Sequence, residues 1–269
     1  MNTIFITGAS TGLGRATALL FAHKGWKVIA TMRTPEKETA LAAEPNITLM
    51  RLDVTNRDEI VTVAARVLEL GPVDVVFNNA GYGLIGPLEG IEDEQIVRQV
   101  NTNLLGVIRV TKAFIPAFRA RQAGMFIATT SIGGLITYPF GSMYHATKWA
   151  LEGWSESLSF EMSVFGIGVK TVSPGGINTD FMSRSMVMAK HPAYDAAVQK
   201  LFKVYSQPER ALIRSSADQI AEVVFEAATD GKDQLRYVAG VDANITYAKR
   251  LAEGPEAFRK NMAATFLGD

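Results

Sequence analysis

The chain has 269 residues, 27 lysines and arginines balanced by 27 aspartates and glutamates, and an apolar fraction of 48%. This size and composition predict a single globular α/β domain over residues 1–269, and a zero net charge without basic clusters argues against nucleic acid as a partner. The absence of cysteine excludes disulfides, a thiol nucleophile and cysteine metal sites. Three widely spaced histidines predict no metal site, and no apolar run approaches a membrane span. We therefore expect a soluble, cytoplasmic protein.

A strand, a glycine-rich turn and a helix form the first unit of the chain. Residues 3–7 are a short apolar run of strand-forming residues, so we expect no signal peptide. Three glycines follow in the pattern Gly-x-x-x-Gly-x-Gly, and apolar residues then recur at helical spacing. Glycines allow a tight turn, and a helix N-terminus attracts a pyrophosphate. The predicted dinucleotide contacts in this turn are Gly8, Ser10, Thr11, Gly12, Leu13 and Gly14.

The end of the second predicted strand, residues 26–31, bears on the choice of cofactor. NAD proteins of this fold carry an acidic residue about twenty positions beyond the glycines, where it binds the adenosine ribose. Here Arg33 follows the strand instead, and an arginine suits a 2′-phosphate. The sequence therefore favours NADP(H), while the nearby Glu36 keeps NAD possible.

The third and fourth predicted strands, residues 47–52 and 73–77, also end in candidate cofactor contacts. Asp53 and Val54 follow the third strand, and Asp53 either accepts a hydrogen bond from an adenine amino group or caps the next helix. Ligands of parallel sheets lie beyond the carboxyl ends of the strands. We therefore expect the cofactor to contact three of the four residues that follow the fourth strand, Asn79, Ala80 and Gly81.

A broad apolar face predicts one helix over residues 93–120, with Asn101 and Asn103 in its middle. Asparagine has a poor helix propensity, so these positions are either solvated or mark a local distortion with a role.

Ser131 follows a fifth predicted strand, residues 124–130, and a helix extending to about residue 165 carries Tyr144 and Lys148. Residues four apart share one face of a helix. A tyrosine hydroxyl has a pKa near 10, and a neighbouring ammonium group lowers that pKa. The pair is therefore a candidate general acid/base, and Ser131 could hold a substrate oxygen beside it.

The remaining elements complete the expected fold. A sixth strand at residues 167–172, a loop at 173–179, a helix at 218–229 and a seventh strand at 235–238 continue the alternation of strands and helices. Residues 180–215 break it with a methionine-rich apolar segment, which is either a helical substrate lid or a packing and interface excursion. We predict a Rossmann-type, doubly wound, mostly parallel seven-stranded sheet flanked by helices, with the lid after strand six.

In order and spacing, these motifs resemble the short-chain dehydrogenase/reductase family, and the resemblance spans essentially the whole chain. The glycine turn is similar to the family's cofactor turn, and residues 78–81 are similar to its strand-four signature. Ser131 with Tyr144 and Lys148 resembles its active site. Residues 79–89 are similar to the hydroxysteroid- and retinol-dehydrogenase-like branch.

The resemblance implies hydride transfer between a nicotinamide and a carbonyl carbon. In that scheme Tyr144 exchanges the proton, Lys148 lowers the tyrosine pKa and binds the nicotinamide ribose, and Ser131 holds the carbonyl oxygen. Asn103 matches the family's helix asparagine, which holds a water in a proton relay. The nicotinamide-side loop would supply four cofactor contacts, Pro174, Gly175, Ile177 and Thr179.

A small hydrophobic carbonyl or alcohol is the expected substrate. Reduction of a ketone or aldehyde with NADP(H) is favoured over NAD-dependent oxidation of a secondary alcohol, and the complete Ser–Tyr–Lys set disfavours a nucleotide sensor without chemistry. His145, bulkier than the small residue usual after the tyrosine, is expected on a helix face, with contact to substrate or to a subunit interface as the alternative. A homodimer or homotetramer is also expected. The candidate substrate wall is Gly133, Tyr138, Phe140, Met143 and Gly176.

Overall fold

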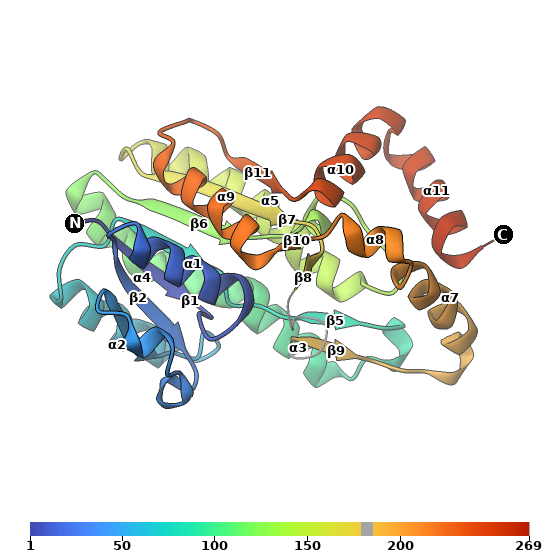
Figure 1. Cartoon of the computed structure of the whole chain (residues 1–269), viewed down its shortest axis with the longest axis horizontal. Helices are drawn as coiled ribbons and strands as arrows, with labels where there is room; N and C mark the ends of the chain where they lie inside the picture. The colour runs from blue at the N-terminus through green and yellow to red at the C-terminus, as the bar shows by residue number, and fades with distance from the viewer. Residues whose placement is uncertain (179–184, 269) are drawn as a thin grey trace.

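The computed structural model describes residues 1–178 and 185–268, and a seven-stranded parallel sheet organises them. The strands lie in the order β11-β7-β6-β4-β1-β2-β3, and every neighbouring pair is parallel (Figure 1). The predicted doubly wound α/β fold is therefore confirmed. The strands of this sheet are β1 (Thr3–Thr7), β2 (Lys27–Met32), β3 (Ile47–Arg51), β4 (Val75–Asn78), β6 (Met125–Thr129), β7 (Gly168–Pro174) and β11 (Arg236–Ala239).

Helices cover both faces of the sheet. In Figure 1, α1 and α9 lie side by side over one face, and they contact each other. None of the helices in the described ranges is both long and apolar enough to cross a bilayer. The helices are α1 (Gly12–His23), α2 (Arg57–Glu69), α3 (Asp93–Val100), α4 (Gly106–Arg121), α5 (Ser142–Ser163), α7 (Asp195–Tyr205), α8 (Pro208–Leu212), α9 (Ala217–Thr229), α10 (Val241–Glu253) and α11 (Pro255–Leu267).

The hydrophobic core is divided between the two faces of the sheet. Successive side chains of a strand point to opposite faces, so Ile4 and Ile6 of β1 pack in one cluster with α1 and α9. Phe5 packs in the other cluster with α2 and α4, and its ring lies 4.9 Å from that of Phe114. Burial on both faces explains why the central strands are almost continuously apolar in sequence.

Strands β1 and β4 are neighbours in the sheet. The chain adds β2 and β3 on the side of β1, and then β6, β7 and β11 on the side of β4, so the direction in which strands are added reverses between β1 and β4. In open α/β sheets, ligands bind in the crevice beyond the carboxyl ends of the strands at such a reversal. The turns after β1, β4, β6 and β7 therefore converge on one edge, and these turns carry the candidate site residues.

The helix predicted over residues 93–120 is interrupted by a π-helical turn, Asn101–Leu105, between α3 and α4. Single π-turns within α-helices are rare and recur at functional sites. The turn buries Asn103, whose Oδ1 accepts a hydrogen bond from the Tyr82 amide and whose Nδ2 donates to the Tyr82 carbonyl. Of the two alternatives for this asparagine, the local distortion is correct.

The segment after β7 leaves the sheet and returns to it. Short parallel pairs join β8 (Ile177–Asn178) to β10 (Ser215–Ser216), and β5 (Gly83–Ile85) to β9 (Met186–Met188). Between these pairs lie α7 and α8, so the predicted helical character of residues 180–215 holds for these elements, while 179–184 lie outside the described residues. Strand β9 was not expected, because three residues are too few to produce a periodic pattern.

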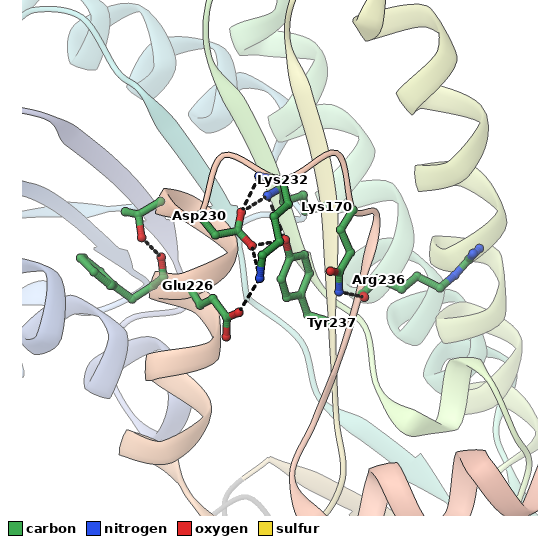
Figure 2. Close-up of polar contacts among 9 residues, drawn as sticks. Lys170, Glu226, Asp230, Lys232, Arg236 and Tyr237 are labelled. Carbon is green, nitrogen blue, oxygen red and sulfur yellow. Dashed lines mark hydrogen bonds and ion pairs between the residues drawn. The ribbon is translucent and has the colours of Figure 1, made fainter.

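A buried ion pair anchors β11, the last strand, away from the turns that carry the candidate site residues (Figure 2). Lys170 of β7 donates to Asp230, at the end of α9, over 2.8 Å and to the Tyr237 hydroxyl over 3.0 Å. The Tyr237 hydroxyl in turn donates to the other Asp230 oxygen over 2.7 Å. Because Lys170 and Asp230 are almost fully buried, this closed network stabilises the junction of β7, α9 and β11.

Candidate active site

A cavity of about 1110 Å³ opens at the carboxyl edge of the sheet and extends from the glycine turn to α7. All the predicted cofactor contacts line it except Gly14, which packs behind the turn, and Thr179, which lies outside the described residues. Ser131, Tyr144 and Lys148 line its middle. The predicted cofactor contacts and the predicted catalytic residues therefore line one cavity.

The glycine turn is packed against the turn after β4 with no space for extra side-chain atoms. Gly8 has a left-handed backbone (φ +68°), and a Cβ there would lie 2.8 Å from the Ala80 Cα. A Cβ on Gly14 would lie 2.4 Å from the Gly8 carbonyl oxygen and 2.5 Å from Asn79 Nδ2. The side-chain amide of Asn79 also donates through Nδ2 to the Thr7 and Gly8 carbonyls, over 3.1 Å each. This cradle brings the N-terminus of α1 to the cavity, where its amides suit a pyrophosphate.

Arg33 and Asp53 stand at the adenosine end of the cavity. Arg33 is exposed and lines the cavity, whereas Glu36 does not line it. Asp53 Oδ1 accepts hydrogen bonds from the amide and hydroxyl of Thr55, and Asn56 caps α2 instead. The alternative that Asp53 caps the helix is therefore wrong. Burial raises the pKa of Asp53, but the hydrogen bonds from Thr55 and the charges of Arg33 and Arg51 together leave the pKa below its ordinary value.

Ser131, Tyr144 and Lys148 meet where β6 ends and α5 begins. The Ser131 hydroxyl accepts a hydrogen bond from the Gly133 amide over 3.0 Å, which fixes its orientation. The Lys148 ammonium lies 5.9 Å from the centre of the Tyr144 ring and donates to the Thr129 carbonyl over 2.8 Å. Tyr144 and Lys148 thus share one face of α5, as their spacing predicted.

The pKa values of this pair differ from the expectation drawn from their spacing. Burial raises the pKa of Tyr144, and the neighbouring Ser131 hydroxyl only partly opposes this shift. Burial lowers the pKa of Lys148 to about 8, although the carboxylate of Glu152, one turn along α5, acts in the opposite direction. In this structure the phenol is therefore held protonated at neutral pH, and the lowering of its pKa by Lys148 is not seen.

His145 is buried, and both of its ring nitrogens are engaged. Its Nδ1 donates to the Gly133 carbonyl over 2.7 Å, and its Nε2 accepts from the Tyr138 amide over 2.9 Å. A Cβ on Gly133 or on Gly141 would lie within about 3 Å of the ring, so glycines at both positions leave room for it. His145 thus holds the 131–141 segment against α5, and it also lines the cavity.

The loop after β7 contacts the C-terminal helix α10. The Gly176 amide donates to Asp242 Oδ2 over 2.6 Å, and a Cβ on Gly175 would lie 2.1 Å from Asp242 Oδ1. Pro174, Gly175, Gly176 and Asp242 all line the cavity. Asp242 thus fixes the loop that the sequence predicts beside the nicotinamide, although no motif pointed to it.

The substrate end is built partly from predicted residues. Gly133, Tyr138 and Gly176 line the cavity, but Phe140 and Met143 do not. Phe140 has a left-handed backbone (φ +61°) and packs edge-on against Tyr194, and Met143 packs in the cluster around Leu84. Several lining residues were missed because they lie on the segment from β9 to β10 or on C-terminal elements, where no motif marks them, namely Val187, Leu201, Phe202, Tyr205, Arg210, Ile213, Arg214, Asp242 and Thr246.

A doubly wound sheet that brings a glycine cradle and a Ser–Tyr–Lys set into one cavity defines an α/β oxidoreductase of the dinucleotide-binding class. Residues 2–189 match the family model described as short chain dehydrogenase, and the chain belongs to this family. A histidine, aspartate and glutamate cluster able to hold a metal ion is absent from residues 1–178 and 185–268.

The relatives of the chain include proteins named as dehydrogenases. It is 33% identical to human retinol dehydrogenase 8 over 92% of this chain and 83% of that protein. A short-chain dehydrogenase from Streptomyces avermitilis has a TM-score of 0.83 and 32% identity, covering 94% of this chain and 92% of its own. An alcohol dehydrogenase from Thermococcus sibiricus, complexed with 5-hydroxy-NADP, has a TM-score of 0.72 and 26% identity, covering 89% and 96%. The likeness to retinol dehydrogenase 8 agrees with the branch that residues 79–89 indicated.

Proposed function

We propose that this protein is an NADP(H)-dependent reductase that converts a ketone or aldehyde of a hydrophobic substrate into an alcohol. The observation that carries this proposal is the Tyr144 phenol beside Ser131 in the cavity, since a protonated phenol there can donate to a carbonyl oxygen. The apolar lining from the lid, including Leu201 and Phe202, suits a hydrophobic substrate.

The cofactor assignment rests on how the cavity residues fit a dinucleotide. The close packing that Gly8 and Gly14 permit brings the amides at the start of α1 to the cavity, where they suit a pyrophosphate. Arg33 lines the adenosine end without an acidic residue at the end of β2, which suits a 2′-phosphate. The T. sibiricus relative was studied with an NADP derivative. NAD remains the alternative, with Glu36 nearby in sequence.

When bound, the reduced nicotinamide supplies the hydride. Ser131, oriented by the Gly133 amide, holds the carbonyl oxygen where negative charge develops. Tyr144 donates its proton to that oxygen, and Lys148, with a pKa of about 8, offsets the phenolate charge that remains. The water-path role of Asn103 stays a prediction, since its side-chain oxygen and nitrogen are engaged by Tyr82.

Tyr144→Phe tests the proton donor. The variant is expected to bind NADPH as the wild type does and to lose ketone reduction by roughly 10²–10⁴-fold, the usual contribution of a general acid. Near wild-type turnover in a screen of lipophilic ketones would overturn the assignment.

Arg33→Ala tests the cofactor. If Arg33 binds the 2′-phosphate, the ratio of kcat/KM with NADPH to that with NADH falls in the variant. An unchanged ratio would remove the support for NADP(H) and favour the alternative, an NAD-dependent secondary-alcohol dehydrogenase working in the oxidative direction.

We propose that the protein forms a homodimer or homotetramer whose subunit interface is the exposed face of α5. Phe160 is 69% exposed there and Trp149 is 44% exposed, which is unusual for large apolar side chains. Light scattering of the wild type and of Phe160→Glu would test this, since a charge at a packed interface lowers the molar mass that is measured. An unchanged molar mass in the variant would remove α5 as the interface.

A further inference from the structure

Two arginines of the lid region, Arg210 of α8 and Arg214 just after it, line the substrate end of the cavity. We call them the lid arginines. The sequence motifs did not include them, and the proposed reduction of a carbonyl does not use them. Cations beside an apolar cavity therefore require an explanation.

The lid arginines converge on Tyr205, the last residue of α7. Arg214 donates through Nη2 to the Tyr205 carbonyl over 3.3 Å, and its aliphatic stem packs over Gly176. The Arg210 guanidinium lies 4.9 Å from the centre of the Phe266 ring, against which the Tyr205 ring also packs. Burial raises the pKa of Tyr205 and the Tyr138 phenol acts in the same direction, whereas both guanidinium groups act to lower it. One phenol and two guanidinium groups thus gather on a single wall.

Within the described residues, neither lid arginine is within 4.0 Å of a carboxylate oxygen. Asp242 also lines this end, but one of its oxygens accepts from the Gly176 amide and the other faces Gly175. Among the residues that the structure describes, the Arg210 side chain makes no hydrogen bond and the Arg214 side chain makes one. A half-buried guanidinium loses hydration, and its planar set of N–H donors matches a carboxylate in a bidentate geometry.

We propose that the lid arginines, with the Tyr205 hydroxyl, bind a carboxylate at the end of the substrate remote from the reacting carbonyl. The substrate class is then an amphipathic oxo-acid, with an apolar chain or ring system between its two polar ends. This inference rests on the proposed function: Tyr144 and Ser131 receive the carbonyl, the apolar lid residues cover the chain, and the lid arginines fix its anionic end.

Turnover of a matched substrate pair tests the inference. A medium-chain oxo-acid and its methyl ester share the same carbonyl and chain, so the ratio of their kcat/KM values with NADPH isolates recognition of the anion. Charge-assisted hydrogen bonds predict that the wild type prefers the acid by roughly 10-fold to 100-fold, mainly through KM. In Arg210→Met and Arg214→Met the ratio falls, and in the double variant it approaches one.

Arg250→Met is the matched control. Arg250 also lies over an aromatic ring, that of Phe258 at 5.7 Å, but it does not line the cavity. The control removes one positive charge from the C-terminal region and is expected to keep the wild-type ratio. An equal fall of the ratio in the control would show a general effect of net charge and overturn the inference.

A measurement without turnover separates this inference from the proposed reaction. Calorimetric titration of decanoate and decanamide into the enzyme with NADPH compares an anion with a neutral analogue of the same chain length. Tighter binding of decanoate in the wild type, but not in the double variant, supports the site even if no ketone is reduced. If both acid and ester are reduced equally well, or decanoate and decanamide bind alike, the inference is wrong, and the proposed reductase function is unaffected.

Discussion

Replacement of His145 by phenylalanine tests the central structural role of that residue. The ring volume is retained, but the Gly133 carbonyl and the Tyr138 amide lose their partners inside the protein. Each unsatisfied polar group costs about 1–3 kcal/mol when buried. Because the Tyr138 side is only part-buried, we expect His145→Phe to lower the free energy of unfolding by about 2–4 kcal/mol at pH 8.

The loss of stability should depend on pH in a defined direction. Burial lowers the pKa of His145, more than its hydrogen bond to Gly133 raises it. The unfolded chain, with a histidine pKa near 6.5, therefore takes up the proton first. The stability that neutral His145 provides is complete above about pH 6.5 and decreases below it, by at most about 1.4 kcal/mol per pH unit. The difference in the free energy of unfolding between wild type and His145→Phe should therefore be smaller at pH 5.5 than at pH 8, by about 1 kcal/mol.

Urea unfolding at pH 8 and pH 5.5 measures both effects. His23→Phe is the control, because the His23 side chain is 64% exposed near the end of α1 and should leave stability almost unchanged at either pH. Since the Tyr138 ring lines the cavity, His145→Phe should also raise the KM for a bulky ketone more than for a small one. A free energy of unfolding of His145→Phe within about 0.5 kcal/mol of the wild-type value at pH 8 would refute the reasoning. A difference between the two that does not change with pH would refute it as well.

Three further predictions concern other residues. Burial raises the pKa of Asp230, but hydrogen bonds from Lys170 and Tyr237 outweigh it and hold the pKa well below the usual value; Asp230→Asn should cost about 3–5 kcal/mol at pH 7 by urea unfolding, with the gap to wild type narrowing below pH 4. Gly175→Ala places a Cβ 2.1 Å from Asp242 and should weaken NADPH binding in a titration, whereas Gly153→Ala, in an open position on α5, should not. Reduction of a ketone should slow as pH rises past the Lys148 pKa of about 8, and a pH–rate profile of Lys148→Arg should lack that limb.

Much of the fold was predictable from the sequence because its determinants are local. Strands that are buried on both faces are apolar along their whole length, so the seven strands of the sheet were predicted to within two residues at each end. The glycine turn and the Ser–Tyr–Lys set were found for the same reason. Each is a short pattern whose chemistry needs particular residue types at a fixed spacing.

The elements that were missed depend on contacts between distant segments. Strands β5 and β9 have three residues each and exist because they pair with each other across about a hundred positions of the chain. Asp242 is an ordinary acidic residue in the first turn of α10 until the fold brings it to the Gly176 amide. The lid arginines likewise gain significance only from the cavity that they line. Sequence spacing cannot reveal such residues, because the partner that gives each its role lies far along the chain.

The same distinction explains why the Tyr144 pKa was predicted in the wrong direction. Helical spacing correctly placed Lys148 on the face of α5 that carries Tyr144, but the effect of a charge also depends on solvation and on its other partners. Here the ammonium is desolvated and directed to the Thr129 carbonyl, and the phenol is desolvated as well. Both burial effects favour neutral groups, so the tyrosine keeps its proton and the lysine has a pKa near the physiological range. An acid that stays protonated until a carbonyl oxygen begins to gain charge, beside an amine able to exchange a proton near pH 8, is suited to reduction. Desolvation of the pair, which its spacing in the sequence could not show, therefore keeps the proton donor in the form that the proposed reduction needs.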